Sequence, residues 1–272
     1  LTLSFGTAGT GGFAIKNMSL AAYSHYAQTI VTIFMILFGV NFNIFFFLIT
    51  REFSRALFNE ELLTYLGIMA GSIVIIMCNI YPMFDSLYES FHHSAFQVAS
   101  IMTTTGFSTV NFDLWPELSR HLLVVLMISG ACAGSTGGGI KISRVIILFK
   151  SAKNSVYQML HPNTVKVIKM DGQVLEQSTI KNVNNFMILY CAFAIFSILI
   201  ISIDGFSFGV NVSSVLSCIN NVGPGLELVG PLGNYSAFSA LSKIVLCVNM
   251  LIGRLEIFPF LTLLAPSVWK KS

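Results

Sequence analysis

The chain has 272 residues, of which 54% are hydrophobic and only 10% are charged, and its formal net charge is +3. Soluble domains carry about 25% charged residues, so this composition excludes an ordinary soluble domain and assigns the chain to a membrane. Lipid is therefore the expected surrounding partner, and no nucleic-acid partner is expected. Because the sequence has no initiator methionine and no signal peptide, we expect it to be the carboxy-terminal part of a longer protein.

Apolar runs of about 20 residues predict transmembrane helices. Such runs cover roughly residues 27–50, 62–82, 118–148, 183–203 and 237–264, and glycines interrupt the third. Two further stretches, 86–102 and 211–220, are too short and too polar to span a bilayer and predict half-helices. A glycine-bearing loop follows each half-helix.

The order helix, half-helix, glycine loop, helix occurs twice in full, and residues 4–50 resemble the end of a further copy. One copy cannot enclose a pore, so the repeats predict copies around a common axis. The predicted fold is therefore all-α and membrane-integral, with helix–pore helix–filter loop–helix units around a central pore. The expected divisions are 1–50 (end of one repeat), 51–150 (a repeat with a gating loop), 151–182 (cytoplasmic connection) and 183–272 (last repeat).

Charged residues divide between the two predicted sides of the membrane. Basic residues gather on one side, at Arg51, Arg55, Lys141, Arg144, Lys150, Lys153, Lys166, Lys169, Lys181, Lys270 and Lys271. Acidic residues prevail on the other, at Asp85, Glu89, Asp113, Glu117, Asp204 and Glu227. Basic segments stay cytoplasmic, so the glycine loops should open outward, where an acidic mouth concentrates cations. Ordinary solvation of loops is the alternative explanation for each single carboxylate.

The three glycine loops are the candidate ion-binding residues. A dehydrated potassium ion needs a ring of oxygens, which backbone carbonyls supply when glycine allows the required dihedral angles. Threonine hydroxyls could add oxygens, and each half-helix would direct its partly negative carboxy-terminal end at the cation. The alternative is that the glycines only cap helices. The predicted potassium-binding residues are Thr10, Gly11, Gly12, Thr104, Thr105, Gly106, Asn221, Val222 and Gly223.

A second glycine-rich segment lies within the third apolar run, at residues 130–139. Its five glycines each cost a helix about 1 kcal/mol relative to alanine, so the helix should break there. We interpret the segment as a flexible constriction that gates the pore. A phosphate-binding loop is the weaker alternative, because Ile140 separates the glycines from Lys141. The predicted gate residues are Gly134, Ser135, Thr136, Gly137, Gly138, Gly139 and Arg254.

Arg254 lies within the last apolar run. An arginine at membrane depth costs about 2.5 to 3.5 kcal/mol on insertion scales, so it should face protein, water or an acceptor. The carbonyls of the broken third run are suitable acceptors. A snorkelling side chain or a local pair with Glu256 is the alternative.

These motifs together resemble the Trk/Ktr/HKT superfamily of potassium transporters, and its TrkH branch most closely. The resemblance rests on residues 4–13, 104–109, 133–141, 161–163, 221–225 and 253–257. It implies four pore repeats in the full protein, about two and a half of them here, a filter glycine in each repeat, an intramembrane gating loop and an arginine facing it. It also implies a homodimer and a cytoplasmic, nucleotide-binding TrkA-type regulatory subunit, for which residues 141–181 are the expected docking region.

The sequence therefore predicts a multi-pass protein of the bacterial plasma (inner) membrane that takes up potassium through a carbonyl-lined filter gated by a loop. Potassium is the expected substrate, and no enzyme activity and no cofactor are expected. Two alternatives stay open. One is a secondary transporter for sodium or another monovalent cation, and the other is a structural membrane subunit that conducts nothing.

Overall fold

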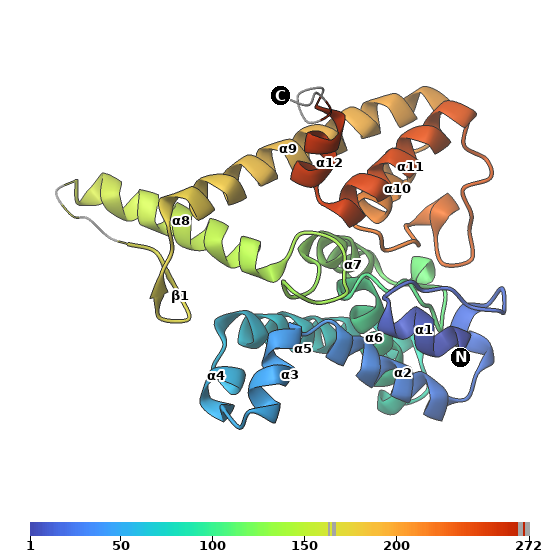
Figure 1. The fold of residues 1–272 in the computed structure, drawn as a ribbon. Coiled ribbons are helices and arrows are strands. Elements are labelled where there is room, and N and C mark those ends of the chain that lie inside the picture. Colours follow the sequence, from blue (N-terminus) through green and yellow to red (C-terminus); the bar gives the residue numbers. More distant parts are fainter. Residues whose placement is uncertain (163, 165–166, 266–268, 270–272) are drawn as a thin grey trace.

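The computed structural model describes residues 1–162, 164, 167–265 and 269, and within them its secondary structure is mostly helical. Figure 1 shows two helical halves, with α7 and the loop after it between them and α8 projecting away from the body. The principal helices are α1 (Thr2–Ala8), α2 (His25–Phe38), α3 (Phe42–Ile49), α4 (Phe53–Leu57), α5 (Glu60–Ile80), α6 (Leu87–Met102), α7 (Glu117–Ser129), α8 (Ile142–Leu160), α9 (Gln177–Ile201), α10 (Phe208–Ile219), α11 (Ala240–Leu255) and α12 (Ile257–Leu264).

Most predicted elements are confirmed. The long apolar helices α5 and α9 could each cross a bilayer, and α6 and α10 are the two half-helices. The third apolar run is broken, as expected, between α7 and α8. Helix α8 continues to Leu160, so the division expected at 150 falls inside a helix. It is followed by a two-stranded hairpin, β1 (Lys169–Met170) and β2 (Gln173–Val174).

The single helix predicted over 27–50 is wrong. Helix α2 ends at Phe38, and α3 leaves the break at 90° to it. The break begins at Gly39, where a Cβ would overlap the hydroxyl of Tyr65 and lie 2.9 Å from Cγ2 of Thr103. Asn41 then caps α3 through its side-chain oxygen, which accepts from the amide of Asn43 at 2.9 Å. Close packing and a new cap therefore end one helix and begin another.

The single helix predicted over 237–264 is also wrong. Helices α11 and α12 meet at an angle of 111°. Glu256 lies between them with a φ of 64°, a left-handed conformation that an α-helix cannot include. Its carboxylate binds Arg144 of α8 at 2.8 Å, which holds the bend against the middle of the fold.

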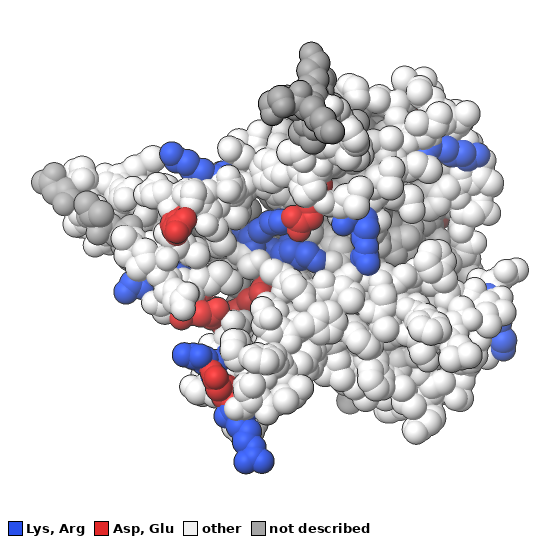
Figure 2. All heavy atoms as spheres, in the orientation of Figure 1, with Lys and Arg blue, Asp and Glu red and all other residues white. Residues whose placement is uncertain are grey.

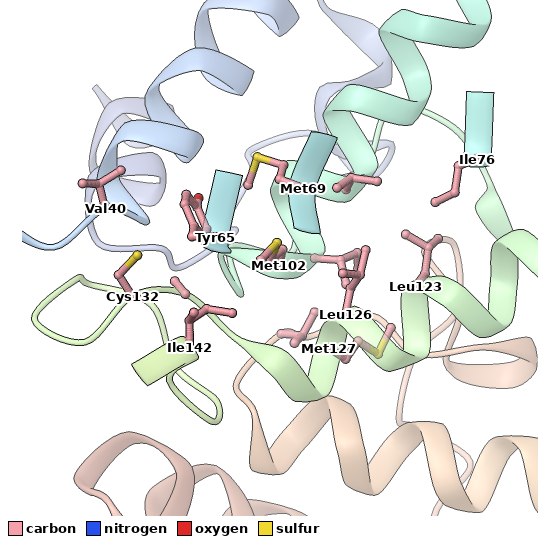
Figure 3. Packing of buried hydrophobic residues seen from close by; sticks show 14 of the residues in the cluster. Val40, Tyr65, Met69, Ile76, Met102, Leu123, Leu126, Met127, Cys132 and Ile142 are labelled. Atoms are coloured by element: carbon pink, nitrogen blue, oxygen red, sulfur yellow. The ribbon is translucent and has the colours of Figure 1, made fainter. Parts of the chain in front are cut away.

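A buried apolar cluster supports the segment between α7 and α8. Figure 3 shows side chains from α5, α6 and α7 meeting residues at both ends of that segment. Cys132, near the start of the segment, and Ile142, just after its end, are completely buried within the cluster. The other labelled members are Val40, Tyr65, Met69, Ile76, Met102, Leu123, Leu126 and Met127. The segment is therefore anchored at both ends in the core.

Charged side chains are sparse on the face drawn in Figure 2. They gather toward the end where α4 and the hairpin lie and in the centre between the two halves, and most of the remaining face is uncharged. Such a distribution suits a protein surrounded by lipid. Asn163, Lys166, Lys270 and Lys271, which entered the sequence analysis, lie outside the described residues.

Candidate functional site

The three candidate filter loops begin with the same backbone motif at the ends of α1, α6 and α10. The second residue beyond each helix has a left-handed φ: 49° at Thr10, 58° at Thr104 and 57° at Asn221. The amide of this residue donates to the carbonyl three residues earlier. The amide of the following residue donates to the carbonyl five residues earlier, which belongs to Gly6, Ser100 or Ser217 in the three loops. This is the Schellman arrangement, which directs the last carbonyls of each helix toward the loop.

The predicted filter glycines lie beyond these caps. Gly12, Gly106 and Gly223 have φ values of 64°, 86° and 104°, a region that favours glycine. The cap position is therefore occupied by threonine or asparagine, and capping does not account for the glycines. Each loop consequently contains two left-handed residues separated by one other residue.

The loops also contact one another. A Cβ on Gly12 would overlap the carbonyl oxygen of Thr105, and a Cβ on Gly106 would overlap that of Val222. Gly12, Gly106 and Gly223 all line one cavity of about 390 Å³. The three segments, far apart in sequence, thus converge on a common space.

Threonine side chains of the loops are engaged within the protein. The Thr103 hydroxyl donates to the Ala99 carbonyl and shares a hydrogen bond with the Thr105 hydroxyl, both at 2.7 Å. The Thr104 hydroxyl accepts from the amide of Gly138 at 2.6 Å. These contacts hold the loop in shape and connect it to the glycine-rich segment.

The segment between α7 and α8 (residues 130–141) contains the glycines predicted to gate the pore, and it is here called the gating loop for that prediction. It packs against the ends of the half-helices. A Cβ on Gly137 would lie 3.0 Å from the carbonyl oxygen of Thr103, and one on Gly138 would lie 2.6 Å from that of Asn220. The Thr10 hydroxyl donates to the carbonyl of Thr136 at 2.8 Å. One loop therefore touches all three candidate filter segments, and its glycines permit this close approach.

Arg254 binds the gating loop directly. Its guanidinium donates to the Thr136 carbonyl at 2.9 Å, which is the acceptor expected for an arginine within an apolar run. The alternative partner, Glu256, binds Arg144 instead. The ammonium of Lys141 turns back onto the carbonyl of Gly137. A phosphate-binding loop would need that lysine and free amides, so this geometry disfavours the nucleotide alternative.

Two polar contacts around the last loop were missed by the sequence analysis. The Tyr235 hydroxyl donates to the Gly223 carbonyl at 2.8 Å. A phenol already carries its proton at neutral pH, and burial raises the pKa of Tyr235 further above its ordinary value. Asn220 exchanges hydrogen bonds with the hydroxyl of Tyr190 on α9. Neither tyrosine belongs to a motif, so the sequence carried no signal for either.

Comparison with known proteins assigns this arrangement to a family. The family model described as TrkH, cation transport protein, matches residues 1–271. The chain belongs to the TrkH family. It is 33% identical over 274 residues to the Trk system potassium uptake protein TrkH of Salmonella typhimurium, covering 98% of this chain and 56% of that protein. It is 31% identical over 271 residues to TrkG of Escherichia coli, covering 97% and 55%.

A solved structure of a TrkH family member has the same fold. The crystal structure of the potassium transporter TrkH from Vibrio parahaemolyticus superposes with a TM-score of 0.87 at 30% identity, covering 98% of this chain and 58% of that one. The chain therefore has the membrane-embedded fold of Trk transporters, and it spans little more than half the length of these relatives.

Proposed function

We propose that this chain forms part of a potassium uptake transporter of the bacterial plasma (inner) membrane, crossing it several times. Ions would move inward along carbonyl oxygens of the three loops, with one such loop in each of four repeats in the full protein. The observation that carries the proposal is the convergence of three identically capped half-helices, each followed by a left-handed glycine, on one cavity. The membrane potential would drive entry, at about 2.3 kcal/mol per charge per 100 mV.

The gating loop is proposed to open and close this pathway. It lies against all three loops, and Arg254 holds its Thr136 carbonyl. A positive charge beside the pathway also raises the barrier to a passing cation. A conformation in which Arg254 releases the loop would widen the passage.

Two partners complete the proposal: a second copy of the protein, and a nucleotide-binding TrkA-type regulator on the basic side. Support for the docking position of the regulator comes from α8, which projects from the body and carries Lys150 and Lys153. The proposal of these partners rests on the resemblance to the family, and the projection supports only the position of the regulator.

Uptake in cells lacking their own potassium transporters tests the proposal. The full-length protein should restore growth at low potassium and rubidium uptake, and the purified protein in planar bilayers should carry potassium current. Absence of both would favour a non-conducting subunit. Uptake of sodium in preference to potassium would favour the secondary-transporter alternative.

A further inference from the structure

One buried carboxylate holds both ends of the gating loop. Glu61 lies in the first turn of α5 and is only 3% exposed. Its Oε1 accepts from the amide of Ala133 at 2.7 Å and from the amide of Ser143 at 3.0 Å. Ala133 lies in the first part of the loop and Ser143 just beyond its end. Because one carboxylate oxygen accepts from an amide at each end, this contact ties the two ends of the loop together.

The two ends of the loop meet where Glu61 binds them. The amide of Ile142 donates to the carbonyl of Ala131, and the amide of Cys132 donates to that of Gly39, both at 3.1 Å. Ile142 and Cys132 are buried in the apolar cluster. The carboxylate of Glu61 is buried beside them, so its hydrogen bonds to Ala133 and Ser143 are needed to offset the cost of its desolvation. Movement of the first turn of α5 would therefore shift or weaken the hydrogen bonds at both ends of the loop.

The same turn of α5 is attached to the hairpin of residues 169–174. Asp171 accepts from the amide of Glu60 at 2.7 Å and from the side chain of Asn59 at 2.9 Å. A carboxylate at a helix N-terminus is favoured by the helix dipole. Lys150 joins the carboxylate of Glu60 to the carbonyl of Lys169, to which it donates at 2.8 Å.

The shape of the hairpin fits this contact. Asp171 and Gly172 have φ values of 50° and 78°, as in the tight type I′ turn that Asp-Gly favours. The turn presents the Asp171 carboxylate to α5 at its tip. The hairpin thus contacts the residue immediately before Glu61.

We propose that Glu61 is a positioning residue that links the hairpin to the gating loop. A partner that displaces the hairpin would release Asp171 from α5, and the first turn of α5 would then loosen its hold on Ala133 and Ser143. This role as a regulatory link rests on the proposed function, since the loop gates a pathway only if the chain conducts. The link itself is a mechanical connection that can be measured without any ion flow.

Amide hydrogen exchange in the full-length protein tests the link. Glu61→Ala removes the shared acceptor, so exchange over residues 130–143 should rise about tenfold, while residues 103–108 should keep their rate. Glu61→Gln retains an acceptor oxygen and should restore most of the protection. Glu52→Ala is the matched control, because Glu52 pairs with Arg55 on the surface and touches no part of the loop.

Asp171→Ala provides the decisive comparison, because Asp171 is exposed and its loss leaves the core intact. It should raise exchange over 130–143 a few-fold, and adding it to Glu61→Ala should bring no further rise, since the two act through one connection. Unchanged exchange in Asp171→Ala, or additive effects in the double variant, would overturn the link.

Electrical recording separates this inference from the proposed function. Glu61→Ala and Asp171→Ala should both raise the open fraction without altering the ratio of potassium to sodium permeability. Potassium current with an unaltered open fraction in both variants would overturn the regulatory role alone. A protein that carries no current but shows the exchange response would overturn the proposed function and support the link.

Discussion

Gly106→Ser perturbs the candidate filter at a crowded position. Real Cβ atoms essentially never come closer than 3.0 Å to another heavy atom. A Cβ at position 106 would lie much closer than this to the carbonyl oxygen of Val222, and 3.2 Å from the carbonyl carbon of the same residue. The residue also has a left-handed φ of 86°. The substitution therefore strains its own backbone and pushes away a carbonyl of the neighbouring loop.

Both costs can be put in order-of-magnitude terms. A left-handed conformation costs a residue with a side chain about 1–2 kcal/mol, and overpacking a tight site costs about 1–3 kcal/mol. Displaced filter oxygens would bind potassium less favourably. A loss of about 2 kcal/mol in binding free energy weakens potassium binding roughly 30-fold, since each 1.4 kcal/mol changes the dissociation constant tenfold. Sodium, which is smaller, gains relatively from the distorted ring.

The assay is rubidium uptake with sodium as competitor, followed by reversal potentials of the purified protein under potassium and sodium gradients. Gly106→Ser should reduce the preference for potassium at least tenfold. Gly67→Ser on α5 is the control, because a Cβ there meets nothing within 4 Å. A folded Gly106→Ser protein that keeps the wild-type ion preference would refute the filter role.

The remaining predictions concern contacts of the loops. Arg254→Ala removes the hydrogen bond to the Thr136 carbonyl and should raise potassium flux several-fold, measured as rubidium uptake per protein; equal or lower flux would contradict a restraining role. Thr104→Val deletes the acceptor for the amide of Gly138, which should cost about 1–3 kcal/mol and lower the melting temperature in detergent. Tyr235→Phe removes the hydrogen bond to the Gly223 carbonyl of the candidate filter. For a bond of about 1 kcal/mol, the potassium concentration for half-maximal uptake should rise about fivefold. Expression should be unchanged.

The break within the third apolar run could be predicted because its cause is local. Five glycines within 130–139 cannot sustain a helix whatever surrounds them. The breaks at Gly39 and Glu256 could not be predicted, because each depends on a partner distant in sequence. Gly39 passes Tyr65 of α5, and Glu256 is held by Arg144 of α8.

The sequence by itself determined that the chain lies in a membrane, where half-helices end in glycine loops and where one span is interrupted. Those features follow from hydropathy and backbone propensity, which act within a few residues. Only the tertiary structure decided that three loops converge on one cavity, that the Thr104 hydroxyl binds the gating loop, and that Glu61 clasps it at both ends. Such contacts depend on how whole helices pack, and helix packing is a property of the folded chain as a whole.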